Sequence, residues 1–369
     1  MSFRVTSYHL TNDNTGFSGA SFTLTLNNDL SEHYFAIVES AGAGTGANSA
    51  SNPDDNLARI TGDPFGDLGT TTASNELQLR RSSTVNNWQG VVTVVECIDD
   101  YENSGFRLLG VAEITGTGTG LSGSFSHEPA DDASNVSYFL GGTLTSQTSP
   151  ANHNAGAFSL SRLNGTTGQW ARLFGGGSSA ADGEATVYAI EWGAEWTVGE
   201  ASDDKDPVSG GSPPNVSVHM NVIPVTSVDA ESTFVYMMAL SDDNGLADGP
   251  FSAIYGLGDG VNLPTGATNE MYWTRYTGGD RNIISAFLIT HPLLKVEHII
   301  GTGSSNTFFG MATGNAQAGP WVIGDNGGGS GEVYGSTGAV DWSEGVRGCL
   351  LYTSPSPRDA TLSRMPSSA

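Results

Sequence analysis

The chain has 369 residues, with 14 Lys and Arg against 39 Asp and Glu, so its net charge is −25 although only 14% of its residues are charged. A typical soluble domain is about a quarter charged, so the imbalance comes from missing basic residues. Only two lysines occur, Lys205 and Lys295, which excludes nucleic-acid binding through a basic patch. No window approaches 18 uninterrupted apolar residues, so we expect no membrane insertion, and the N-terminus shows no signal peptide.

The composition and the pattern of apolar residues predict an all-β fold. Fifty glycines disfavour long helices. Apolar and polar residues alternate in short runs that are rich in β-branched side chains, at residues 21–26, 76–80, 91–95, 157–162, 185–190 and 216–222. Turn signals such as Asn164-Gly165 and Asp182-Gly183 separate these runs. Short strands at this spacing indicate tandem antiparallel β-sandwich modules.

An internal repeat sets the predicted module boundaries. The segment TGFSG at 15–19 resembles TGLSG at 119–123, and aromatic pairs follow both at Tyr34-Phe35 and Tyr138-Phe139. Alternating strands that end in Arg80, Arg162 and Arg275 come next, and then apolar strands, of which the first two end in Glu96 and Glu191. Chance similarity between Gly- and Ser-rich strands is the alternative explanation. The repeat predicts modules at 1–115, 116–200 and 215–300, and the start of a truncated fourth module at 301–348.

Two further inferences depend on this repeat. The arginine and the glutamate of each module are expected to form a partly buried ion pair with a structural role. The acidic, Ser/Gly/Pro-rich segment at 199–214 predicts a linker over 201–214. An acidic interaction segment is the alternative for these residues.

The last 21 residues break the composition. Residues 349–369 read CLLYTSPSPRDATLSRMPSSA and contain no glycine. The string resembles a translated sequencing adapter, with an index-sized gap at 360–362; a Ser/Pro-rich tail is the alternative. We therefore expect an artefactual tail on a fragment of metagenomic origin. Its removal leaves Cys97 as the single cysteine, which excludes a disulfide within the chain.

Catalytic templates are missing from the sequence. It contains no GxSxG, GxxxxGK[ST], HExxH or paired CxxC motif, so we predict that the chain is not an enzyme. A carboxylate pair for glycoside hydrolysis has no fixed sequence spacing, and that alternative stays open.

One acidic loop is a candidate metal site. Asp242, Asp243, Asn244 and Asp248 place several oxygen ligands close together, which suits calcium. A hairpin connection explains the same residues. Apart from calcium at this loop, we expect no cofactor.

Two tryptophans are candidates for carbohydrate binding. Trp88 and Trp170 both follow polar, turn-like stretches, and a tryptophan at a loop tip can stack on a sugar ring. Packing against the edge of a sheet is the alternative, and we favour it for both side chains.

The module pattern carries a resemblance to a known group of proteins. The pattern has three parts in order. It begins with a start like VTSVDAESTF at 225–234, continues with a strand that ends in arginine, and closes with an apolar strand, which in the first module ends in Val94-Val95-Glu96. This order resembles repeats in tailed-phage virion proteins of the tail-fibre type. The resemblance implies a non-enzymatic structural or surface protein of a virion, assembled without secretion. Its implied partners are other virion proteins, copies of itself and a host surface glycan. Two alternatives remain, a carbohydrate-binding or carbohydrate-active β-sandwich protein and a fragment of a bacterial surface adhesin.

Overall fold

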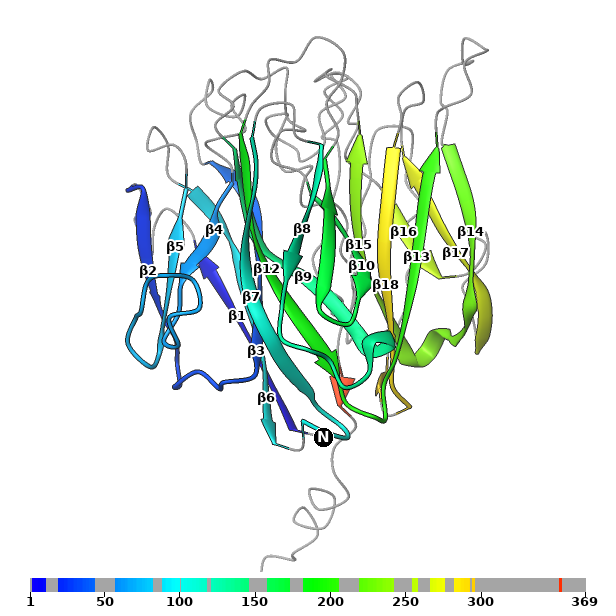
Figure 1. Cartoon of the computed structure of the whole chain (residues 1–369), viewed down its shortest axis with the longest axis horizontal. Helices are drawn as coiled ribbons and strands as arrows, with labels where there is room; N and C mark the ends of the chain where they lie inside the picture. The colour runs from blue at the N-terminus through cyan, green and yellow to red at the C-terminus, as the bar shows by residue number, and fades with distance from the viewer. Residues whose placement is uncertain are drawn as a thin grey trace, which may run out of the picture.

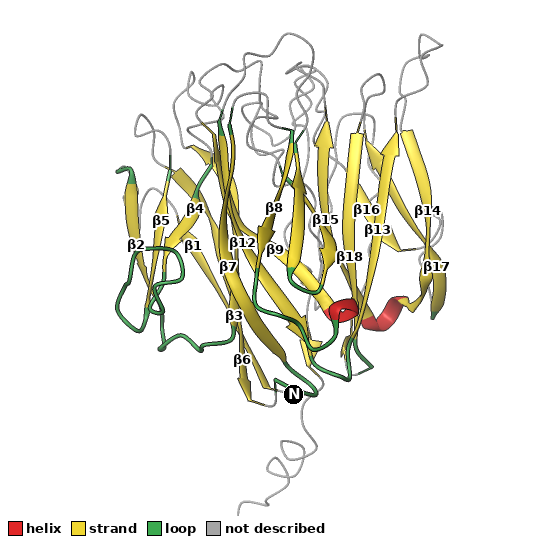
Figure 2. Ribbon diagram, in the orientation of Figure 1, coloured by secondary structure: helices red, strands yellow, loops and turns green. Residues whose placement is uncertain are grey.

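A computed structural model describes residues 2–10, 19–43, 57–81, 88–99, 101–117, 121–145, 158–172, 182–205, 219–241, 254–257, 266–275, 282–292, 294–295 and 352–353. These residues form strands and two short 3₁₀ turns (Figures 1 and 2), which confirms the all-β prediction. The elements are β1 (Ser2–Leu10), β2 (Ser21–Thr25), β3 (Tyr34–Ala43), β4 (Arg59–Gly62), β5 (Glu76–Arg80), β6 (Trp88–Asp99), β7 (Phe106–Gly116), β8 (Ser122–Ser126), η1 (Ala133–Asn135), β9 (Val136–Thr145), β10 (Ser159–Asn164), β11 (Thr167–Ala171), β12 (Gly183–Trp192), β13 (Thr197–Lys205), β14 (His219–Asp229), η3 (Ala230–Ser232), β15 (Thr233–Ser241), β16 (Ile254–Leu257), β17 (Ala267–Arg275), β18 (Asn282–Thr290), β19 (Leu294–Lys295) and β20 (Tyr352–Thr353).

The strand pairings repeat three times along the chain. Residues 2–99, the first module, form the antiparallel sets β1-β6-β3 and β2-β5-β4. Residues 106–192, the second module, form β7-β12-β9 and β8-β11-β10, and residues 197–290, the third module, form β13-β18-β15 and β14-β17-β16. Each module thus has one sheet in the order first, sixth, third strand and one in the order second, fifth, fourth. This connectivity is the predicted tandem β-sandwich arrangement.

The module boundaries differ from the predicted ones. The predicted boundary after residue 115 falls inside β7, which pairs with β12 of the second module. The predicted linker overlaps β13, where residues 201–205 pair with β18. Asp203, Asp204 and Lys205 made this segment resemble a linker, but β13 lies at the edge of its sheet, where charged residues are common because they block further pairing.

Other predicted segments lie outside the described residues. They are 206–214 of the predicted linker and all of the predicted fourth module at 301–348. Within 349–369 the structure describes only β20, which pairs with β19.

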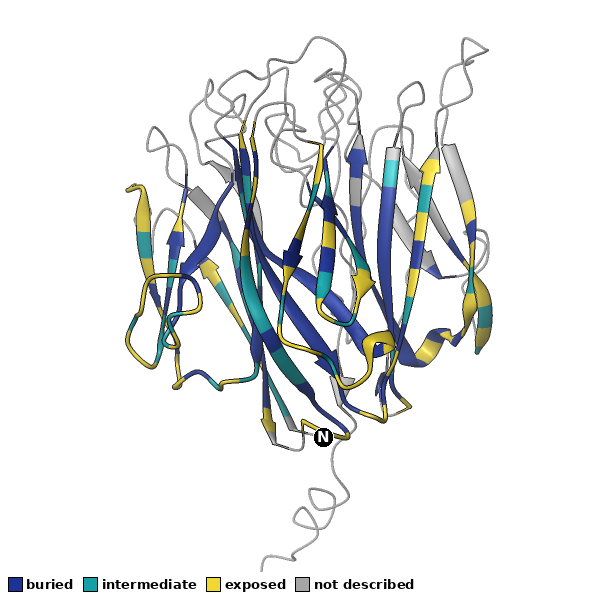
Figure 3. Ribbon diagram, viewed as in Figure 1, coloured by how far each residue is buried: buried dark blue, intermediate teal, exposed yellow. Residues whose placement is uncertain are grey.

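The three modules share a hydrophobic core. Phe35 of β3 stacks on Phe139 of β9 with ring centroids 4.1 Å apart, and Phe139 lies 4.8 Å from Tyr236 of β15. The third strands of successive modules therefore meet through aromatic side chains, and the buried residues follow the strands across the molecule (Figure 3). A second buried cluster, which includes Leu257 and Met271, fills the interior of the third module.

Candidate functional site

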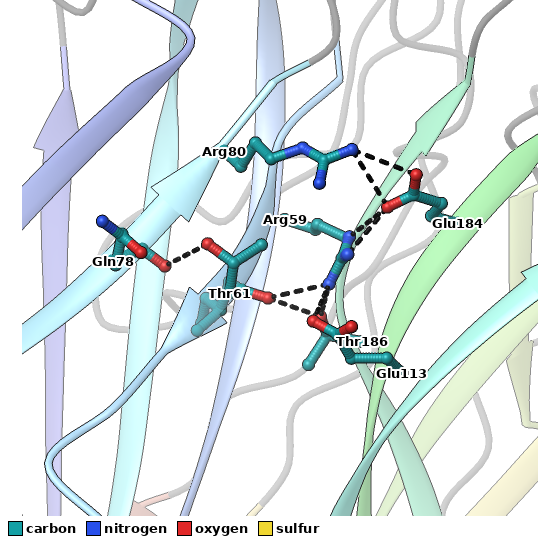
Figure 4. A network of polar contacts seen from close by, with 8 residues as sticks. Arg59, Thr61, Gln78, Arg80, Glu113, Glu184 and Thr186 are labelled. Carbon is teal, nitrogen blue, oxygen red and sulfur yellow. Dashed lines mark hydrogen bonds and ion pairs between the residues drawn. The ribbon is translucent and has the colours of Figure 1, made fainter. Parts of the chain in front are cut away.

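A network of charged side chains lies where the first and second modules meet. Arg59 of β4 and Arg80 of β5 face Glu113 of β7 and Glu184 and Thr186 of β12 (Figure 4). We call these five residues the Arg59 junction. Alternation along β4 and β12 sets the positions, because side chains two residues apart on a strand point to the same face.

Arg59 is the centre of the junction and is 3% exposed. Its Nη2 donates to Glu184 Oε2 at 2.7 Å, and its Nη1 donates to Glu113 Oε1 at 2.8 Å and to Thr186 Oγ1 at 3.1 Å. The Thr186 hydroxyl in turn donates to the carbonyl oxygen of Ile60 at 2.5 Å. Arg80 Nη2 completes the network with a bond of 3.0 Å to Glu184 Oε1.

A glycine allows the two modules to approach each other here. Arg59 pairs with Gly142 of β9, which joins the β2-β5-β4 and β9-β12-β7 strands into one six-stranded sheet. Gly142 has a φ of +93°, and a Cβ atom at this position would collide with the carbonyl oxygen of Ala58. The backbone of Ala58 and Arg59 therefore occupies the space that a Cβ atom at position 142 would need.

The charges of the junction balance. Two guanidinium groups meet two carboxylates, and the only deeply buried ion, Arg59, has several acceptors around it. Buried charges are tolerated when they are paired and hydrogen-bonded in this way. The junction therefore joins strands of different modules.

A corresponding contact joins the second and third modules. Arg162 of β10 donates from Nε to Glu200 Oε2 of β13 at 3.1 Å, and the hydroxyls of Ser159 and Ser285 are hydrogen-bonded at 2.7 Å in a buried position. In both junctions the fourth strand of one module provides an arginine to a glutamate on the first strand of the next.

The two predicted glutamates do form ion pairs, but with arginines other than the predicted ones. Glu96 binds Arg4 and Glu191 binds Arg107, each with a shortest N–O distance of 2.5 Å, whereas Arg80 and Arg162 serve the junctions. The sequence analysis predicted the wrong arginines. The arginines that bind these glutamates lie on the first strand of each module, more than 80 positions before the glutamates in the chain. The hydrogen bond to Glu96 raises the pKa of Arg4. The corresponding positions in the third module hold Thr197 and Thr290, and the hydroxyl of Thr290 lies 2.7 Å from that of Thr233 on β15.

One buried aspartate was missed by the sequence analysis. Asp63 follows β4, is fully buried, and accepts hydrogen bonds at Oδ1 from the backbone N–H groups of residues 65, 66 and 67. Tyr34 Oη donates to its Oδ2 at 2.7 Å, and burial raises the pKa of Tyr34 well above its usual range. The Asp-Pro-Phe-Gly sequence is a turn signal that could have indicated this role.

The predicted carbohydrate site is not assembled in the described residues. Trp170 lies within β11 and is 8% exposed, with its ring 5.8 Å from that of Phe158. It is therefore a packed strand residue, which is the interpretation that we favoured from the sequence, and it does not lie at a loop tip. Trp88 begins β6, and its side chain lies outside the described residues.

The predicted calcium ligands Asp242, Asp243, Asn244 and Asp248 also lie outside the described residues. Within the described ranges, no group of three or more His, Cys, Asp or Glu side chains is placed to hold a metal ion. Cys97 is buried.

No helix in the described part of the chain is long and apolar enough to cross a membrane. No protein-family model, curated protein or solved structure matches the chain.

Proposed function

We propose that the chain is a non-enzymatic structural protein of a phage virion, of the tail-fibre type, and that it forms part of the particle surface. The observation that supports this proposal is the joining of successive modules by buried contacts. The Arg59 junction and the Ser159–Ser285 contact fix each module against the next, and the core continues through Phe35, Phe139 and Tyr236. Such a body resists bending, which suits an extended element of a particle.

The distribution of polar groups supports the same proposal. Arg59 and Asp63 are both buried, and each binds strand or turn atoms, so their contacts maintain the fold. The surface combines a net charge of −25 with only 14 basic residues in the whole chain. A surface of this kind keeps a particle soluble and repels polyanions.

The test is to locate the protein in purified particles. Virions from the source community would be banded by density, and their peptides identified by mass spectrometry. Antibodies raised against the full chain would then be used for immunogold labelling. We expect peptides from residues 2–290 in the virion band, and gold on the particle surface. Recovery in bacterial envelope fractions, with none in the virion band, would contradict the proposal in favour of the adhesin alternative.

The carbohydrate alternative needs a separate experiment, because a virion protein can also bind a glycan. A glycan array probed with the full chain would show saturable binding if the carbohydrate alternative holds. Binding together with absence from particles would support a carbohydrate-binding protein in place of a virion component. Genes for portal or terminase proteins beside the coding sequence would favour the virion.

A further inference from the structure

The hairpin between β10 and β11 carries an Asn-Gly pair at its turn. Asn164 stands opposite Thr167, so the turn itself consists of Gly165 and Thr166. The Asn164 side chain is exposed. In an Asn-Gly pair the glycine nitrogen can attack the side-chain carbonyl carbon of the asparagine, because the glycine has no Cβ atom to obstruct the approach. The turn therefore presents a reactive pair to solvent.

The turn also holds the Asn164 carboxamide ready for attack. The Thr166 backbone N–H donates to Asn164 Oδ1 at 2.9 Å, and the Thr166 hydroxyl donates to the same oxygen at 3.0 Å. Negative charge develops on Oδ1 when a nucleophile adds to Cγ. Two donors already aimed at this oxygen stabilise that charge, as the donors of an oxyanion hole do.

The nucleophile is available in the same turn. The carbonyl oxygens of Gly165 and Thr166 each accept a hydrogen bond of 3.0 Å, from the backbone N–H groups of Ala130 and His127. The Gly165 N–H donates no hydrogen bond to any residue that the structure describes. The turn is thus anchored through its carbonyl oxygens, while the Gly165 nitrogen can lose its proton to hydroxide.

We infer that Asn164 is a self-modification site, which the turn converts to aspartate and isoaspartate without another protein. The Gly165 nitrogen bonds to Asn164 Cγ, the bond from Cγ to Nδ2 breaks, and Nδ2 leaves as ammonia with the proton that Gly165 gave up to solvent. Water then opens the cyclic imide. Cleavage between Cγ and the Gly165 nitrogen gives aspartate, and cleavage at the backbone carbonyl of residue 164 gives isoaspartate.

Asn135 shows what an unreactive asparagine looks like in the same module. It is 9% exposed, and its Nδ2 donates to the carbonyl oxygen of Trp196 at 3.1 Å. The β-branched Val136 follows it and crowds the backbone nitrogen that would have to attack. Asn135 is therefore an internal reference for a site that should not react.

The modification changes a contact between modules. Arg162 lies two residues before Asn164 on β10 and donates to Glu200 of β13 at 3.1 Å. Either product adds a negative charge beside this pair, and isoaspartate also adds a methylene group to the backbone of a tight turn. We expect the contact between the second and third modules to loosen as the protein ages. No step of this inference depends on the proposed virion function.

The experiment is incubation of the full chain at mildly alkaline pH, followed by mass spectrometry that separates asparagine, aspartate and isoaspartate peptides. We expect both products at Asn164 and none at Asn135. Thr166→Val removes the hydroxyl donor and keeps the backbone N–H. It should slow the reaction by about tenfold, less than in an enzyme, because water can partly replace the lost donor at an exposed turn. Thr166→Ser keeps the hydroxyl and is the matched control, with the parent's rate.

Two further comparisons separate the turn from the sequence around it. Asn244 and Asn326 are also followed by glycine and lie outside the described residues; Thr166→Val should leave their rates unchanged. In the urea-unfolded chain, the parent and Thr166→Val should react equally fast at Asn164. Absence of conversion at Asn164, or equal rates for the folded parent and Thr166→Val, would overturn the inference. An equal slowing by Thr166→Val in the folded and unfolded chains would also overturn it.

Discussion

β5 and β11 are the fifth strands of the first and second modules, and each pairs with the second strand of its own module. The sizes of the paired side chains differ between the two modules. In the first module Leu79 of β5 stands opposite Phe22 of β2. In the second module Trp170 of β11 stands opposite Gly123 of β8, and a Cβ atom on Gly123 would lie 2.6 Å from the indole ring. The larger side chain of the cross-strand pair thus lies on the second strand in the first module and on the fifth strand in the second module, where Gly123 leaves the space that the Trp170 indole fills.

A neighbouring pair also differs in side-chain size between the two modules. Leu77 and Leu24 pair in the first module, whereas Gly168 and Phe125 pair in the second, and a Cβ atom at Gly168 would collide with the phenyl ring. The difference teaches that the repeat conserves strand order and pairing register more than residue identity or side-chain size. The contacts between modules should then be less tolerant of change than the pairs within them.

The largest expected effect is at the contact between modules. Gly142→Ala should lower the free energy of unfolding by about 4 kcal/mol, because backbone strain at positive φ adds to the collision with the Ala58 carbonyl. Gly69→Ala is the control, since Gly69 also has a positive φ, +76°, but faces open space, so about 1 kcal/mol is expected. Chemical denaturation measures both. Equal losses would show that the approach of β4 to β9 is unimportant.

The next effect separates the buried from the exposed arginine of the Arg59 junction. Arg59→Met should cost about 3 kcal/mol, since it leaves Glu113 and Glu184 facing each other without their central cation. Arg80→Met should cost less than about 1 kcal/mol, because its side chain is 45% exposed. Urea midpoints of the two variants check the ranking, and a loss at Arg80 as large as that at Arg59 would contradict it.

An exchange of residues tests the coupling between positions 123 and 170 directly. Gly123→Phe alone and Trp170→Leu alone should each cost about 2 kcal/mol, through overpacking and through a cavity respectively. The double variant recreates the Phe22–Leu79 pair and should return to within about 1 kcal/mol of the parent. Thermal unfolding of all four proteins forms a double-mutant cycle. Additive losses of stability would show that residues 123 and 170 do not compensate each other in size.

The sequence predicted the strands well because alternation is a local signal. Residues 76–80 were predicted as a strand and form β5, and residues 157–162 overlap β10. The equivalence of these two strands was wrong, since β10 is the fourth strand of its module and β5 is the fifth. The register instead makes Arg81 and Arg172 equivalent: each follows a fifth strand, is buried, and donates its backbone N–H to the residue before the second strand, Ala20 or Leu121.

The site was less predictable than the strands. Arg59 and Glu184 are separated by 125 positions, and nothing local in either segment indicates that partner. Burial of Trp170 depends likewise on a glycine 47 residues earlier. Side chains that act across sheets are specified by register, which a single sequence reveals only after the strands have been paired.

The smallest effect concerns one position at which the three modules differ in chemistry. The residue directly after Glu96, Glu191 or Thr290 is Cys97, Trp192 or His291, and all three are buried. Burial lowers the pKa of His291, although Glu195, whose Oε2 lies 3.3 Å from Nε2, partly raises it. The third module alone therefore has an imidazole at this position.

The sign of the pH effect follows from proton binding. With a folded-state pKa below the usual 6.5, the unfolded chain binds more protons, so stability is complete above pH 6.5 and falls as the pH drops through the folded pKa. His33, whose pKa burial also lowers, adds a fall of the same sign. His291→Gln should therefore reduce the loss between pH 7 and pH 5 by about 1 kcal/mol without abolishing it. Glu195→Gln should move the His291 titration to lower pH, as measured by NMR of the imidazole, and a shift to higher pH would contradict this account.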